Sequence, residues 1–384
     1  MRYVLLVILS FYLLGCAQRL PPAEHSQLPD LPVIDQNFHQ PAELPDHTAF
    51  YQLTSSQQLH FLTYFNSPLQ QTIAPNRRLF NYLDRHLERF NYQGANSLAA
   101  ETLENLSGNC LSLALLVKAL ANLVDIEVSY RVIYTEPVFD ISEQTLLSSN
   151  HVRSYLTNPP LPDEESQSHA GRTIGIDYFR GSLDRTGTTL STETFEAMVY
   201  NNLAVDAFLA NDMDSAYWLS RKALLRDPQF KDSINLIAVI YRRQGDLLLS
   251  KQWYELGLRY HPNNASLLNN YLVLAEQLRD EALIADLQQQ IRLSNDDNPY
   301  IWFELAWQAE QKQQIDTAIY FYRKLIEAAP YLHRANLAMA KLLLQQHNDA
   351  AARRALQQAL EYSYEPALKA QYQAKLAMLE QMAK

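Results

Sequence analysis

A spacing of 34 residues recurs through the C-terminal half of this 384-residue chain. Pro228 and Pro262 are 34 residues apart, and Pro330 follows after twice that distance. Helical pairs of this length stack when small residues let their helices approach and a proline ends the second helix. Two series on the same spacing carry mostly small residues: Ala204, Ala238, Leu272, Ala306 and Ala340, and Ala216, Ser250, Ile284, Ala318 and Ala352.

The spacing resembles that of the tetratricopeptide repeat, a helix–turn–helix unit. The resemblance implies an all-α solenoid over residues 197–384 that binds a protein or peptide partner. Gly245-Asp246 falls where the turn between two helices is expected, and Trp302, Phe303 and Trp307 are expected in the core or lining a groove. We expect a closing helix to about Met382 after five units: 197–230, 231–264, 265–298, 299–332 and 333–366.

The first residues read as an export signal. Arg2 precedes an apolar run over residues 3–14, which is too short to span a bilayer, since a helix needs about 20 residues for that. The run ends in Leu13-Leu14-Gly15-Cys16, which resembles the lipobox of bacterial lipoproteins. The resemblance implies a signal peptide over residues 1–15, lipid on Cys16, and a membrane anchor. Ala17-Gln18 after the cysteine favours the outer membrane, facing the periplasm.

Residues 16–48 read as a tether. Prolines among polar residues build no core and predict a semi-extended chain. The histidines of this stretch are expected to be solvated rather than to bind metal: His25, His39 and His47. The prolines are Pro21, Pro22, Pro29, Pro32, Pro41 and Pro45.

Charge and motifs exclude several classes of function. The chain has 32 basic and 42 acidic residues, a formal charge of −10, and no basic run, which disfavours general binding of nucleic acid. The sequence has no metal-ligand spacing, glycine-rich phosphate loop or dinucleotide fingerprint, so no metal or cofactor is expected. Nine glycines in the whole chain favour a mostly helical protein.

Residues 49–195 have a mixed pattern. Residues 77–90 carry apolar side chains at helical spacing, and residues 111–123 are apolar nearly all round, which predicts a buried helix. Helices followed by strands predict an α+β domain. Three strands are expected over residues 127–134, 151–156 and 173–179.

Cys110 is the main candidate for a catalytic nucleophile in this region. It begins the apolar helix, where the helix dipole and unpaired N–H groups stabilise a thiolate and lower its pKa. His151 and Asp177 follow on two of the predicted strands. A nucleophile, a base and an orienting acid from neighbouring elements form a catalytic triad.

Residues 99–179 resemble a transglutaminase-like domain of the papain-like superfamily. The resemblance rests on Gly108-Asn109-Cys110-Leu111-Ser112, Asn150-His151-Val152 and Ile176-Asp177-Tyr178-Phe179. It implies Cys110 as nucleophile, His151 as base and Asp177 as the orienting acid. The loop over residues 158–171 is longer than in the family, which leaves Asp163 as a weaker candidate for the acid; His169 in that loop is expected to be exposed. Asn105 or Gln93 would donate to an oxyanion by analogy.

Two functions follow from an α+β transglutaminase-like domain joined to an all-α tetratricopeptide-repeat solenoid. In the first, Cys110 attacks an amide carbonyl and the products are a hydrolysed peptide or a transferred acyl group. In the second, the cysteine pocket is inert and the repeats act as an adaptor for a protein partner. The presence of three triad residues favours the first, whereas repeats are expected under both.

Overall fold

A computed structural model describes residues 35–88, 90–92, 96–134, 138–140, 145–147, 150–158, 172–176, 185–296, 298–363 and 366–382. The predicted signal peptide and lipidated Cys16 lie outside these residues, as do Gln93, Asp163, His169 and Asp177. Within the described ranges, no helix is long and apolar enough to cross a membrane.

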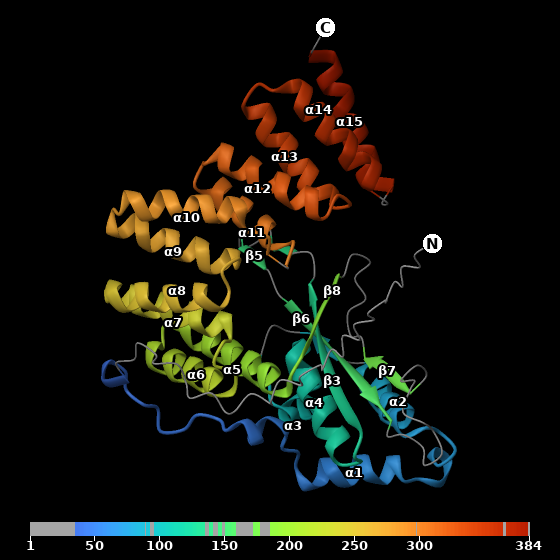
Figure 1. The fold of residues 1–384 in the computed structure, drawn as a ribbon. Coiled ribbons are helices and arrows are strands. Elements are labelled where there is room, and N and C mark those ends of the chain that lie inside the picture. The colour runs from blue at the N-terminus through green and yellow to red at the C-terminus, as the bar shows by residue number, and fades with distance from the viewer. Residues whose placement is uncertain are drawn as a thin grey trace, which may run out of the picture. The chain divides into compact units, whose positions relative to one another are not determined.

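The N-terminal part joins four helices to a four-stranded sheet (Figure 1). The helices are α1 (Ser55–Phe65), α2 (Pro75–Leu87), α3 (Ala99–Asn105) and α4 (Cys110–Asn122). The antiparallel sheet has the order β7 (Thr173–Ile176), β6 (Asn150–Thr157), β3 (Glu127–Tyr134), β8 (Arg185–Leu190). Two short pairs are separate from this sheet: β1 (Asn91–Tyr92) with β2 (Ser107–Gly108), and β4 (Val138–Asp140) with β5 (Thr145–Leu147).

These elements match the predicted order of helix and strands. Helix α4 is shifted by one residue from its predicted range, and β3 has the predicted bounds. Alternate residues of β3 and β6 are buried on the side that packs against α4, among them Tyr130, Val152 and Leu156. Strand β8 was not predicted because its sequence, Arg-Thr-Gly-Thr-Thr-Leu, lacks an apolar alternation.

The C-terminal part is a series of helical pairs. The second helix of each pair begins at residue 213, 247, 281, 315 or 349, always 34 residues after the one before. This regularity confirms the predicted solenoid. The pairs are α5 (Thr192–Leu209) with α6 (Met213–Arg226), α7 (Lys231–Gln244) with α8 (Leu247–Tyr260), α9 (Ala265–Leu278) with α10 (Glu281–Leu293), α11 (Ile301–Gln311) with α12 (Ile315–Ala328), and α13 (His333–Gln345) with α14 (Asp349–Tyr362).

Helix α15 (Pro366–Met382) closes the series by packing against α14, as predicted. Gly245 takes a φ of 87° at the end of α7, in the left-handed region that favours glycine at a helix C-terminus. The neighbouring Asp246 then caps α8 by accepting a hydrogen bond from the N–H of Leu249. The predicted turn at Gly245-Asp246 is therefore confirmed.

Residues 35–51, which we term the strap, pack more closely against the rest of the chain than the semi-extended tether predicted over residues 16–48. Phe38 is 5% exposed and stacks on Tyr217 with a centroid distance of 3.8 Å. Asp35 accepts hydrogen bonds of 2.6 Å from Arg221 and from the hydroxyl of Tyr217. The prediction rested on the prolines of this stretch, whereas Phe38 and Asp35 make the contacts that hold it against the repeats.

The two histidines of the strap have different surroundings. His39 is exposed, as predicted, although its backbone N–H donates to Asp214. His47 is about a third exposed and lies 3.2 Å from Asp46. The strap ends in the short helix His47–Tyr51, whose cap Asp46 accepts from the N–H of Thr48.

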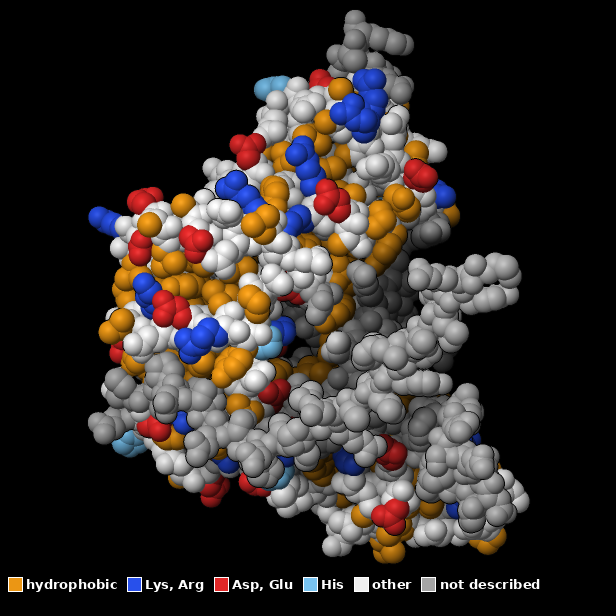
Figure 2. All heavy atoms as spheres, viewed as in Figure 1, with side chains coloured by type: hydrophobic (Ala, Val, Ile, Leu, Met, Phe, Trp, Pro, Cys, Tyr) orange, Lys and Arg blue, Asp and Glu red, His pale blue; other side chains and the backbone are white. Residues whose placement is uncertain are grey.

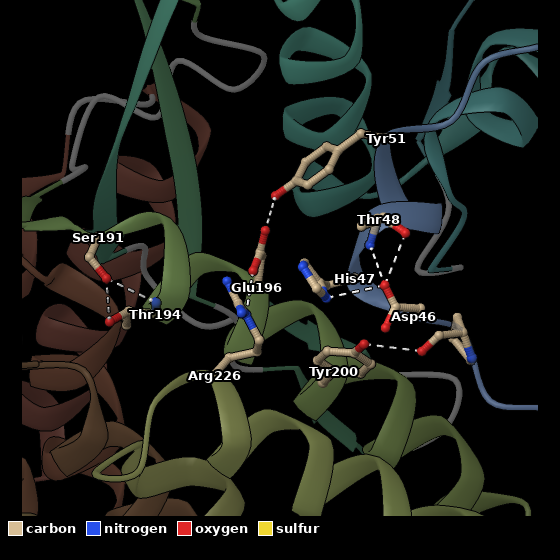
Figure 3. A network of polar contacts seen from close by, with 10 residues as sticks. Asp46, His47, Thr48, Tyr51, Ser191, Thr194, Glu196, Tyr200 and Arg226 are labelled. Carbon is tan, nitrogen blue, oxygen red and sulfur yellow. Dashed lines mark hydrogen bonds and ion pairs between the residues drawn. The ribbon is translucent and has the colours of Figure 1, made fainter. Parts of the chain in front are cut away.

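A buried carboxylate joins the strap to the first helical pair (Figure 3). Glu196 is 3% exposed and accepts hydrogen bonds from Tyr51 at 3.1 Å and Arg226 at 2.6 Å. Beside it, Phe195 stacks on Tyr130 of β3 at 3.9 Å. Burial raises the pKa of Tyr51, so its hydroxyl stays protonated and donates to Glu196. The first pair thus buries a face that an end unit of a repeat array would otherwise expose.

Candidate functional site

Cys110 begins α4 behind a tightly constrained turn. Asn109 caps the helix by accepting a 3.0 Å hydrogen bond from the N–H of Ser112. Gly108 has a φ of 151°, and a Cβ there would lie 2.6 Å from the Cβ of Ser112. Glycine is required at this position for both reasons. The predicted place of Cys110 at a helix start is correct.

The environment of the thiol is the opposite of what the sequence indicated. Cys110 is 8% exposed, and burial raises the pKa of its thiol. The backbone N–H groups of Val152 and Leu111 favour the thiolate, but desolvation is the larger effect. The expected lowering of the Cys110 pKa is therefore wrong for this conformation.

The structure brings Cys110 to the strand that carries His151. The sulfur lies against the backbone of Val152, which follows His151 on β6. His151 is half-buried and pairs across the sheet with Ile133. Asp177 follows the last residue of β7 and lies outside the described residues. Asn105 is exposed at the end of α3.

A cavity of about 490 Å³, which was not among the sites predicted from the sequence, lies between the third and fourth helical pairs. All four helices of these pairs contribute to its wall. This volume is within the range of ligand pockets, roughly 300–1,000 Å³. The apolar lining residues are Leu272, Val273, Ile291, Leu305, Ala309 and Phe321.

One residue of the cavity wall interrupts the series of small residues in the third pair. Leu272 stands where the second and fourth pairs have Ala238 and Ala306, each 0% exposed. Leu272 is only half-buried and lines the cavity. Ile284 likewise replaces a small, fully buried residue of the other pairs. A larger side chain at such a position holds neighbouring helices apart. This feature is visible in the sequence, because Leu272 and Ile284 interrupt the two series of small residues.

Amides and one carboxylate form a polar chain at the cavity. Asn269 donates to Gln308 at 3.3 Å, and Gln308 is 3.5 Å from Glu304. Burial raises the pKa of Glu304. Arg292 and Lys312 are exposed residues of the cavity lining. The cavity therefore offers an apolar floor with hydrogen-bonding and charged groups at its edge.

Of the three aromatic residues of α11, Trp302 lies in the core, as predicted, whereas Phe303 and Trp307 are half-buried. Trp302 is 4% exposed, stacks on Phe321, and lies 4.1 Å from the ammonium of Lys324.

In Figure 2, hydrophobic side chains gather over the repeats among scattered charges of both signs, without a continuous basic field on this face. Across the described part of the chain, no three or more His, Cys, Asp or Glu side chains are placed to hold a metal ion.

No protein-family model and no curated protein matches this sequence. Among solved structures, YrrB, a protein with tetratricopeptide repeats and an unusual peptide-binding site, is 18% identical over 46% of this chain and 92% of its own, with a TM-score of 0.27. MamA is 17% identical over 43% of this chain and 91% of its own, with a TM-score of 0.28. PilF of Pseudomonas aeruginosa is 19% identical over 48% of this chain and 84% of its own, with a TM-score of 0.31. Independently of these similarities, the C-terminal half is an all-α solenoid of helical pairs whose 34-residue period is that of tetratricopeptide repeats.

Proposed function

We propose that this protein is an adaptor of the bacterial envelope, anchored by lipid on Cys16 and binding a protein partner through its helical repeats. The cavity between the third and fourth pairs is the observation that carries this proposal. A stack of regular pairs needs no such opening, and its apolar floor with a polar edge suits a partner side chain inserted between flanking polar contacts.

The raised pKa of Cys110 supports the adaptor over an enzyme. A nucleophilic thiol needs a sizeable thiolate fraction near neutral pH, and burial opposes this. The repeats would bind a protein partner in both an adaptor and an enzyme. The state of the Cys110 thiol is therefore the feature that distinguishes the two functions.

Photo-crosslinking in cells tests the adaptor. A benzophenone amino acid at Gln288, an exposed residue that lines the cavity, is expected to give one discrete adduct. The same group at Gln289, its exposed neighbour outside the lining, is the matched control and should give little or none. Val273→Arg places a charge on the cavity wall and should abolish the Gln288 adduct. Equal adducts from both positions, unaffected by Val273→Arg, would contradict a partner site at the cavity.

The proposed anchor has its own test. A stretch over residues 3–14 that is too short to span, followed by Cys16 in a lipobox-like sequence, supports lipidation. Cys16→Ser should release the protein from the membrane fraction and prevent normal cleavage. A variant that is cleaved and stays membrane-bound would exclude the lipoprotein proposal. The neighbouring Ala17-Gln18 supports an outer-membrane location facing the periplasm.

One observation favours a second function, an amide hydrolase or acyl transferase of the transglutaminase-like kind. Cys110 begins a helix and lies against Val152, the neighbour of His151. In this function His151 would take the thiol proton while Cys110 attacks the carbonyl carbon, and Asp177 would hold His151. As the C–N bond breaks, His151 would give that proton to the departing amine, and the acyl group left on sulfur would then pass to water or to a second amine.

Comparing two variants distinguishes the functions. If Cys110→Ala reproduces the phenotype of deleting the whole protein while Val273→Arg does not, the chain acts as an enzyme. If Val273→Arg reproduces the deletion and Cys110→Ala behaves as wild type, the adaptor stands. Both variants should be checked for normal abundance, because lower abundance alone would reduce function.

A further inference from the structure

One side-chain amide connects the first helical pair to the start of the cysteine helix. The carbonyl oxygen of Asn96 accepts hydrogen bonds from Asn109 at 2.6 Å and Asn202 at 3.2 Å. Its amide nitrogen donates to Asp206 at 2.7 Å. Asn109 is the cap of α4, whereas Asn202 and Asp206 belong to α5. Asn96 therefore uses both its donor and its acceptor to hold two elements together.

The neighbouring residue strengthens the hold on α4. The backbone N–H of Ser97 donates to the hydroxyl of Ser112 at 2.9 Å, and Ser112 also bonds to Asn109. Cys110 lies between these two residues and is 8% exposed. The sulfur also lies against Val152 of β6, so a movement of the first turn of α4 away from β6 would expose the thiol and would strain the contacts to Asn96 and Ser97.

The α5 side of this contact belongs to a polar row on the first helices of the pairs. Asn202 and Asp206 are four residues apart, on one face of α5. Asn270 occupies the position of Asn202 two units later and donates to Asn235 at 3.0 Å. Asn235 of α7 stands at the position of Asn201, one residue before that of Asn202, so its contact with Asn270 is separate from the one that Asn96 makes.

We propose that Asn96 is a clasp through which the first helical pair controls the exposure of Cys110. A change on α5 that disturbs Asn202 or Asp206 loosens Asn96, weakens the cap of α4, and lets the first turn of α4 move away from β6, which exposes the thiol. The described conformation is the closed one. The coupling goes beyond partner binding and does not depend on whether Cys110 is a nucleophile.

Alkylation of the full chain with iodoacetamide tests the clasp. The rate is measured under native conditions by mass spectrometry of the peptide that contains Cys110. Asn96→Asp places a carboxylate against Asp206 and should speed alkylation about tenfold, as expected when one charge-assisted hydrogen bond is lost. Combining Asn96→Asp with Asp206→Asn restores a donor–acceptor pair with the roles exchanged. The double variant should return to within about twofold of wild type.

Controls separate the clasp from general loosening. Asn235→Asp makes the same chemical change in the polar row, away from Asn96, and should leave the rate within about twofold of wild type. Asn202→Ala removes the longest of the three bonds and should give an intermediate rate; it replaces Asn96→Asp if that variant fails to fold. The clasp is overturned if alkylation is unchanged in Asn96→Asp and Asn202→Ala, or if the Asp206→Asn partner change fails to restore the rate.

Discussion

The second and third helical pairs have the same length, yet they pack differently against their successors. Helices α8 and α9 are in close contact, and Gly257 of α8 leaves room for only a hydrogen, since a Cβ there would lie 3.0 Å from Leu267. The third boundary instead contains the cavity of about 490 Å³. Ile291 occupies the position of Gly257 and lines it. The period of a repeat thus sets where helices begin, whereas the size of a few residues sets how closely pairs approach.

The largest change in stability is expected from placing a large side chain at the small, buried position 238 of the second pair. Ala238 is 0% exposed, so Ala238→Leu forces a large side chain into a filled space. We expect a loss of about 3 kcal/mol in the free energy of unfolding, since overpacking typically costs 1–3 kcal/mol or more. Urea denaturation monitored by circular dichroism measures it. A neutral result would mean that α7 and α8 leave room for a larger side chain at this position, which would contradict the tight packing of the second pair.

Replacing the large residue at the equivalent position of the third pair with alanine should reduce the free energy of unfolding much less. Leu272 is half-buried, so Leu272→Ala removes fewer contacts than truncation of a core leucine, which costs about 2–5 kcal/mol. We expect a loss of about 1 kcal/mol by the same denaturation experiment. A loss near 4 kcal/mol would show that Leu272 is packed as firmly as the alanines of the other pairs.

Adding one methylene at the cavity should be favourable. Val273 lines the cavity, and Val273→Leu should raise the free energy of unfolding by about 0.8 kcal/mol, the value of one buried methylene. Val239 is also half-buried and stands at the same position of the second pair, which makes Val239→Leu the matched control. Equal changes in both variants would remove the distinction between the two boundaries.

The smallest effect concerns pH. Glu304 stands where the second pair has Leu236, and burial raises the pKa of its carboxyl above the usual value of about 4.3. The folded chain therefore binds this proton more tightly than the unfolded chain. The stabilisation is complete below the usual pKa and is lost as pH rises through the raised one. Glu304→Gln should flatten the pH profile of stability above pH 4; identical slopes would contradict this assignment.

In the region around Cys110, local sequence patterns predicted the helices and strands but not the contacts between them. The apolar run after Cys110 predicted the buried helix α4, and alternation predicted β3 and β6, because both patterns reflect which side faces a core. The pKa direction of Cys110 could not be predicted, since it depends on burial supplied by β6 as well as on the helix start. Asn96 gave no sequence signal, because its partners are 13 and more than 100 residues away.

The sequence by itself determined the repeat length and the register of the small residues, because capping, turns and close helix approach act within one unit or between neighbours. The first helices follow the predicted units less closely, since α5 begins at Thr192 rather than residue 197 and α11 at Ile301 rather than residue 299. Only the tertiary structure decided that Phe38 packs on Tyr217, that Asn96 joins α4 to α5, and that a cavity remains beside Leu272. Each of these depends on groups far apart in the chain, whose proximity no periodic pattern encodes.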